Sequence, residues 1–309
     1  MNLSEIVNLE FPQKSPYGPR QPQFDVEFDP ETGTIWAWFN CAGNPCFSLG
    51  LLNDIRAHDS MLEAYKGAVP HNGSLHKAHY YVVGSRTPGV FNLGGDLALF
   101  SLLIKSGERE ALAHYAKLCI DNIYPRIRNY RCPNLTTISL IQGDALGGGF
   151  ETALSSDILV AEESAQLGLP EILFNLFPGM GALSLLTRRI GLRAAENLIT
   201  SGRILSAAKL HEMGVIDVLA KDGEGKAAVQ QWINKNQKHR NGFQAVIQAR
   251  DHVSPIERTE LDRIVDIWVD AALRLDERDI KMMNRIVRSQ MRRMDARTAE
   301  PRVSLVAVN

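Results

Sequence analysis

Short runs of apolar residues alternate along the chain with longer segments in which apolar residues recur every three or four positions. The short runs, rich in β-branched and aromatic residues, predict buried strands at 34–39, 80–84, 135–141 and 158–161. The longer segments predict helices at 48–63, 97–104, 111–127 and 150–156. Proline, histidine, asparagine and glycine gather at 68–74, which predicts a loop. Strands that alternate with helices indicate an α/β fold.

The pattern changes near residue 256. Two helical stripes follow, one between Leu261 and Leu275 and one in 280–294. The first 23 residues are rich in proline and polar residues. We therefore predict an N-terminal arm at 1–23, a core at 24–255 and a C-terminal helical module at 256–309. The first stripe fits packing on the core or assembly with other copies of the chain.

Composition limits the classes of function. A formal net charge of −1 argues against nucleic acid or a membrane surface as a partner. The N-terminus lacks a basic region followed by a long apolar stretch, and no apolar run approaches the ~20 residues that a membrane helix needs. These features predict a cytoplasmic protein with no membrane partner.

The cysteines and histidines do not predict a metal site. Cys41 and Cys46 are too far apart for a CxxC motif, and no second pair completes a zinc site. His71, His76 and His79 miss the HxxxH and HExxH spacings. We expect no metal ion and no resident cofactor.

Two glutamates stand in unusual surroundings. Glu151 follows three glycines, which bring backbone N–H groups close to a ligand. Glu171 follows Pro170 within an apolar run, where a carboxylate must be paired, protonated or functional. Taken alone, each glutamate also fits a structural role at a helix start. A further glycine turn, Gly94-Gly95-Asp96, lies upstream.

Four motifs in order resemble the crotonase (enoyl-CoA hydratase) superfamily. They are Gly94-Gly95-Asp96, the ALGGGFE loop ending at Glu151, Pro170-Glu171 and Pro178-Gly179-Met180-Gly181. The resemblance implies a spiral of ββα units with the C-terminal helical module. It also implies that Glu151 and Glu171 are the catalytic residues, and that the N–H groups of Gly95 and Gly148 form the oxyanion hole. Leu146, Met180 and Trp268 fit core positions on pattern alone, and the resemblance implies that they line an acyl pocket.

The local sequence of three segments is similar to one branch of that family, the diffusible signal factor synthases. The segments are Cys46-Phe47-Ser48, residues 90–100 and Ile267-Trp268-Val269-Asp270. The resemblance implies dehydration of a 3-hydroxyacyl thioester on acyl carrier protein, followed by hydrolysis to a free cis-2-unsaturated medium-chain fatty acid used in quorum sensing. The substrate is then phosphopantetheine-linked. A sensor kinase is implied as regulator, and a homotrimer or dimer of trimers as the assembly.

Two other functions remain open at this point. One is an ordinary enoyl-CoA hydratase or isomerase, or a CoA thioesterase, of fatty acid metabolism. The other is a non-catalytic binding protein, which has no use for two buried carboxylates. Basic residues at 281–297 fit either a solvated helix face or a landing surface for an acidic carrier protein.

Overall fold

The computed structural model describes residues 22–41 and 43–299. For residues 291 and 293–299 it describes the backbone but not the side chains. Most of the predicted arm (1–21) and the last ten residues of the predicted C-terminal module (300–309) lie outside the described residues.

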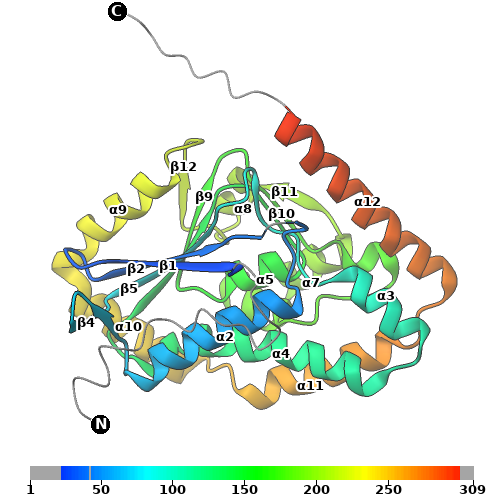
Figure 1. The fold of residues 1–309 in the computed structure, drawn as a ribbon, viewed down its shortest axis with the longest axis horizontal. Helices are drawn as coiled ribbons and strands as arrows, with labels where there is room; N and C mark the ends of the chain where they lie inside the picture. The colour runs from blue at the N-terminus through cyan, green and yellow to red at the C-terminus, as the bar shows by residue number, and fades with distance from the viewer. Residues whose placement is uncertain (1–21, 42, 300–309) are drawn as a thin grey trace, which may run out of the picture.

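A six-stranded sheet forms the centre of the molecule (Figure 1). Its order is β1 (Phe24–Asp29), β2 (Thr34–Phe39), β5 (Tyr80–Ser85), β7 (Thr136–Ile141), β9 (Ile158–Glu162) and β12 (Val218–Ala220). β1 pairs antiparallel with β2, and the other neighbours are parallel. The predicted strands at 34–39, 80–84, 135–141 and 158–161 are confirmed with shifts of one residue at most.

A second, four-stranded sheet runs beside the first. Its order is β11 (Ile204–Ser206), β10 (Gln166–Gly168), β8 (Asp144–Leu146) and β6 (Val90–Asn92). The chain places one strand in the large sheet and the next in the small one, three times over: β5 then β6, β7 then β8, β9 then β10. A helical segment follows each pair. This repetition is the predicted spiral of ββα units.

The predicted loop at 68–74 is wrong. It belongs to a hairpin of β3 (Ala68–His71) and β4 (Ser74–Lys77), whose turn places Asn72 and Gly73 at positive φ. Asn-Gly is a strong hairpin turn, and it was hidden among neighbours that resemble a loop.

Helices cover both faces of the large sheet. The predicted helices are observed as α2 (Leu49–Ala64), α3 (Leu97–Lys105), α4 (Arg109–Ile127) and α5 (Gly148–Leu154). The rest are α6 (Ala182–Ile190), α7 (Leu192–Ser201), α8 (Ala207–Glu212), α9 (Gly225–Asn236), α10 (Arg240–Val253), α11 (Arg258–Ala272) and α12 (Glu277–Ala299). Short 3₁₀ turns are η1 (Asn129–Arg131), η2 (Pro170–Phe174) and η3 (Gln237–His239).

Strand β2 shows how the sheet joins two cores. Its side chains alternate between faces. Ile35, Ala37 and Phe39 join the main core, and Trp36 and Trp38 join a second cluster that includes Val229 and Ile233 of α9. Both faces of this strand are therefore buried, which explains its continuous apolar sequence.

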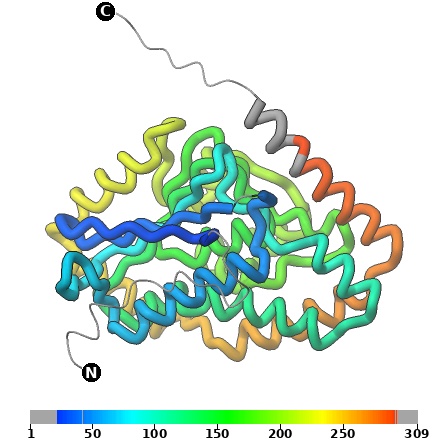
Figure 2. The backbone as a smooth tube through the Cα atoms, in the orientation of Figure 1, coloured from blue at the N-terminus to red at the C-terminus, as the bar shows by residue number. Residues whose placement is uncertain are grey.

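The two C-terminal helices pack onto the part of the molecule that holds α3, α4 and η2. α11 lies against α4, and α12 lies along α3 and η2 at one edge (Figure 2). Within α11, Leu261, Val265, Trp268 and Ala272 are buried. The predicted stripe is thus used for packing inside the chain.

Candidate active site

Glu151 is buried in the first turn of α5, directly after β8 and the glycine turn. Its side chain is 1% exposed. Its Oε1 atom accepts hydrogen bonds from the backbone N–H groups of Met180, at 2.8 Å, and Ala182, at 2.9 Å. The turn that opens α6 therefore holds this carboxyl group in one orientation. Two donated bonds offset part of the cost of burying it.

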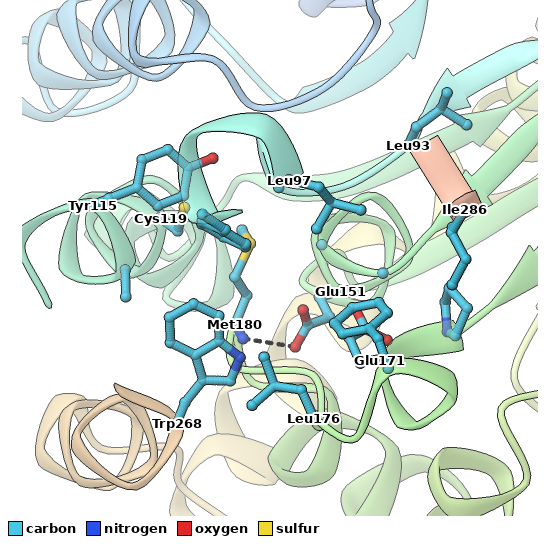
Figure 3. Close-up of a pocket in the computed structure, with 18 of the residues that line it drawn as sticks. Leu93, Leu97, Tyr115, Cys119, Glu151, Glu171, Leu176, Met180, Trp268 and Ile286 are labelled. Atoms are coloured by element: carbon cyan, nitrogen blue, oxygen red, sulfur yellow. Dashed lines mark hydrogen bonds between the residues drawn. The ribbon is translucent and has the colours of Figure 1, made fainter. Parts of the chain in front are cut away.

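Glu171 reaches the same place from η2. The residue as a whole is partly exposed, but its Oε2 atom is buried and has no hydrogen-bond partner in the described part of the chain. A Cβ atom added to Gly147 would lie 2.5 Å from Oε1 of Glu171. The carboxyl group thus lies across the start of α5. Figure 3 shows the carboxyl groups of Glu151 and Glu171 facing one cavity.

Burial raises the pKa of both carboxyl groups. The pKa of Glu151 rises to about 8 because of burial and the nearby charge of Glu171, although the N–H groups of Ala182 and Met180 act in the opposite direction. Burial raises the pKa of Glu171 to about 7, and its own backbone N–H lowers it in part. The two groups titrate as a pair. Burial therefore keeps this pair protonated to a higher pH than two ordinary carboxyl groups.

Two glycine loops meet beside these carboxyl groups. Asn92 Oδ1 accepts a hydrogen bond from the N–H of Gly94 at 2.8 Å, which holds the Gly94-Gly95 turn. A Cβ atom on Gly94 would lie 3.0 Å from the nitrogen of Gly148. Gly95 and Gly148 both line the cavity, and neither N–H has a hydrogen-bond acceptor within the described residues. The two loops are therefore in contact, and both amides are available to donate to a ligand in the cavity.

The glycines of the second loop are required by their contacts. Gly147 has φ +52°, and a side chain there would collide with Glu171. A Cβ atom on Gly148 would lie 2.6 Å from Sδ of Met180. Any larger residue at either position therefore displaces a group that forms the site.

The cavity beside the two carboxyl groups is mainly apolar. About 630 Å³ of space free of atoms lies within it, a figure that includes the solvent at its open mouth. The walls come from the Gly94-Gly95 turn and from α3, α4, α5, η2, α11 and α12. Their apolar side chains are Leu93, Leu97, Phe100, Tyr115, Ala116, Cys119, Phe174, Leu176, Met180, Trp268 and Ile286.

Of the three predicted acyl-pocket residues, Met180 and Trp268 line this cavity. Trp268 packs against Phe100, with ring centroids 5.1 Å apart. Leu146 does not line it. As part of β8, its side chain packs with Val90 and Leu93 in a small separate cluster, and this corrects the expectation.

Several wall residues were not predicted. Tyr115 and Cys119 belong to the apolar stripe of α4, and Ile286 and Gln290 belong to α12. The Tyr115 hydroxyl accepts a bond from the N–H of Asp96, at 3.1 Å, and donates to the carbonyl of Phe47. It thereby supports the glycine turn. Helical spacing reveals that such residues face inward, but a core position and a cavity wall give the same spacing.

The described residues also bear on metal binding and on membrane spans. In the residues that the structure covers, no group of three or more histidine, cysteine, aspartate or glutamate side chains is placed to hold a metal ion. Within that same part of the chain, none of the helices combines the length and apolar character needed to cross a membrane.

One family model and several known proteins match the chain. The family model described as enoyl-CoA hydratase/isomerase matches residues 77–265. The mitochondrial methylglutaconyl-CoA hydratase of Mus musculus is 36% identical over 170 residues, which are 55% of this chain and 52% of that protein. The match thus spans about half the length of that relative.

Solved structures share the fold. DspI of Pseudomonas aeruginosa has a TM-score of 0.62 at 23% identity, covering 82% of this chain and 98% of that chain. The human mitochondrial delta3-delta2-enoyl-CoA isomerase has a TM-score of 0.69 at 19% identity, covering 88% of this chain and 99% of the other. At these identities the likeness concerns the fold.

Proposed function

The chain belongs to the enoyl-CoA hydratase/isomerase family, and from this premise we propose that it converts a medium-chain 3-hydroxyacyl thioester of acyl carrier protein to a free cis-2-unsaturated fatty acid. The acid serves as a diffusible quorum-sensing signal. One observation carries the proposal: two carboxyl groups of raised pKa face one apolar cavity beside two unpaired main-chain amides.

In the first step the substrate loses water. The thioester oxygen accepts hydrogen bonds from the N–H groups of Gly95 and Gly148, and one such donor typically contributes about 3 kcal/mol to stabilising the transition state. Glu171, whose Oε2 atom has no hydrogen-bond partner among the described residues, removes the α-proton. Glu151, whose Oε1 atom is held by two backbone N–H groups, gives a proton to the departing 3-hydroxyl group. A carbon–carbon double bond and one water molecule result.

The second step uses the opposite protonation state. After dehydration Glu151 is ionised and Glu171 is protonated. Glu151 then removes a proton from water as its oxygen attacks the thioester carbon. The tetrahedral oxyanion is held by the same two amides, and Glu171 gives its proton to the departing thiolate when the carbon–sulfur bond breaks. The two steps together return both carboxyl groups to their initial state.

The carrier is inferred from the α12 helix. Its exposed residues Lys281, Arg285, Arg288 and Arg292 recur along one face, while Ile286 and Gln290 line the cavity. A basic surface beside the cavity favours an acidic carrier protein that delivers a phosphopantetheine-linked acyl group. Arg293 and Arg297 also belong to the basic segment predicted from the sequence, but their side chains are not among those that the structure describes. Regulation by a sensor kinase and a location in the cytoplasm remain part of the proposal.

Substitution of the glutamates tests the mechanism. We expect Glu151→Gln and Glu171→Gln each to lower formation of free acid by about a hundredfold or more, because acid–base groups typically contribute that much. The measurement is mass spectrometry of products from a 3-hydroxyacyl carrier-protein substrate. Glu163→Gln, at an exposed residue outside the cavity wall, is the matched control. Wild-type turnover in both active-site variants would refute the mechanism.

A second candidate is an enoyl-CoA hydratase or isomerase, or a CoA thioesterase. The family model and the match to the mouse hydratase favour it. The same assay separates the two when the carrier is changed. A hydratase gives interconversion of hydroxyacyl-CoA and enoyl-CoA without free acid. A CoA thioesterase releases acid from CoA without forming a double bond. Free cis-2-enoic acid from the carrier-protein substrate distinguishes the favoured function.

A further inference from the structure

A second cavity lies behind the catalytic one, and Met180 lines both. Its volume, counted as the space open to the centre of a water-sized sphere, is about 20 Å³. That is enough for a water molecule. Most of its wall is apolar and comes from β1, β2, α2 and β5. We call this second cavity the rear chamber.

Polar residues also line the rear chamber, among them Arg126 of α4 and the tyrosines Tyr81 and Tyr130. Three others have unpaired oxygens: Asp59 of α2, Asn122 of α4 and Thr152 of α5. They are 0%, 6% and 7% exposed. Each has one buried oxygen without a hydrogen-bond partner among the described residues, namely Asp59 Oδ2, Asn122 Oδ1 and Thr152 Oγ1. Three different helices thus contribute residues with unpaired oxygens to the wall of one small cavity.

The remaining side-chain atoms of two of these residues are already engaged. Asp59 Oδ1 accepts a hydrogen bond from the Tyr81 hydroxyl at 3.4 Å. Asn122 Nδ2 donates to the carbonyl of Leu118 at 2.8 Å. The unpaired oxygens therefore have the capacity to bind a further group. An alkyl chain would leave them unpaired, whereas water donates and accepts hydrogen bonds and fits the volume.

The rear chamber is next to the catalytic groups. Thr152 directly follows Glu151 in α5. Met180 donates its backbone N–H to Glu151 and is drawn beside that carboxyl group in Figure 3. The Met180 side chain, which is flexible, thus borders both spaces.

We propose that the rear chamber binds water and supplies it for thioester hydrolysis past Met180. This inference rests on the proposed two-step function. Dehydration releases one water molecule and hydrolysis consumes one, while the acyl chain occupies the catalytic cavity. Asn122 and Thr152 act as positioning residues. The bound water loses a proton to Glu151, its oxygen bonds to the thioester carbon, and the thiol leaves with the proton from Glu171.

The test compares hydrolysis with dehydration in the same turnover. We expect Asn122→Leu and Thr152→Val to lower the ratio of free acid to enoyl thioester by about tenfold, the order of effect of one lost hydrogen bond. Hydrolysis needs the stored water, and dehydration does not. Thr152→Ser retains the hydroxyl and restores the ratio. Thr187→Val is the matched control, because Thr187 also has a buried unpaired hydroxyl but lines neither cavity.

A high-resolution crystal structure supplies the second measurement. We expect a water molecule bonded to Asp59 Oδ2, Asn122 Oδ1 or Thr152 Oγ1, and its loss in the Asn122→Leu, Thr152→Val double variant. An acyl chain end in the rear chamber, or an unchanged ratio in an enzyme that does release free acid, overturns the inference. If wild-type protein releases no free acid from any thioester, the proposed function fails instead, and the crystallographic water still tests the chamber.

Discussion

Glu151 and Glu171 are held in different ways, and this difference assigns their roles. Two backbone N–H groups fix Oε1 of Glu151, whereas Oε2 of Glu171 has no partner in the described part of the chain. A fixed carboxyl group suits delivery of a proton to a hydroxyl at a set position. A less constrained one suits removal of the α-proton and later contact with the departing sulfur.

Gly147 has no room for even one added methyl group, because Glu171 lies against it. We expect Gly147→Ala to displace Glu171 and lower turnover by about tenfold or more, because the added Cβ would lie 2.5 Å from Oε1. An alanine held at the positive φ of this position also lowers the free energy of unfolding by about 1–3 kcal/mol. Steady-state kinetics and thermal unfolding measure the two effects.

The Gly73→Ala variant separates the effect of backbone strain from the effect of displacing Glu171. Gly73 has φ +80°, and a Cβ atom there meets no other atom within 4 Å. This variant carries backbone strain without touching the site, so we expect a lower melting temperature with unchanged turnover. Equal losses of turnover in both variants would contradict the role assigned to the Gly147–Glu171 contact.

At the scale of elements, α12 has two functions on two faces. Ile280 and Met283 are buried, and Ile286 lines the cavity. On the outer face Lys281 pairs with Glu277, whereas Arg285 and Arg288 have no carboxylate partner among the described residues. One helix thus closes the catalytic cavity and presents positive charge beside it.

Charge reversal on α12 tests the carrier. We expect the Arg285→Glu, Arg288→Glu double variant to lower kcat/KM for a carrier-protein substrate by about tenfold, because opposite charges speed encounter. A short N-acetylcysteamine thioester should be converted as before, and the difference should shrink at high salt.

The control reverses charge elsewhere. Lys235 and Lys238 are exposed at the end of α9 and in η3, on a different side of the molecule from α12 (Figure 1). We expect the Lys235→Glu, Lys238→Glu variant to use both substrates like wild type. Equal loss in both double variants would indicate a general charge effect and remove the support for docking on α12.

For the whole molecule, the catalytic pair reduces stability at high pH. Both pKa values are raised in the folded protein from the usual 4.5. The folded state therefore retains protons that the unfolded chain releases, and its stability falls as pH rises from about 4.5 through about 8. We expect the Glu151→Gln, Glu171→Gln double variant to lose less stability across this range.

Urea unfolding at several pH values measures this difference. Glu163→Gln again serves as the control, since its side chain is exposed. A double variant whose free energy of unfolding follows the wild-type pH dependence would show that the two carboxyl groups do not bind protons more tightly on folding.

Assembly is the remaining whole-molecule prediction. The buried stripe of α11 packs on α4, so a homotrimer or dimer of trimers must use other surfaces. Exposed apolar residues on α10 and α11 are Val246, Val253 and Ile267. Light scattering should give three or six times the chain mass of 34.3 kDa. A monomer mass would reject the assembly.

Residue patterns alone were enough to predict the alternation of strands and helices and the positions of the glycine turns. These are local properties, because side-chain periodicity and positive φ depend on near neighbours. The same local signals marked Glu151 and Glu171 as unusual. Local signals misled at the 68–77 hairpin, where strand residues lie among typical loop residues.

How distant segments meet became clear only from the three-dimensional arrangement of the chain. It placed Glu171 against Gly147, directed Leu146 away from the cavity, and brought α4, α11 and α12 into the cavity wall. It also set the two raised pKa values, because burial and the distance between charges depend on packing between segments far apart in the chain. The chemistry of the site follows from those contacts, which periodicity does not encode.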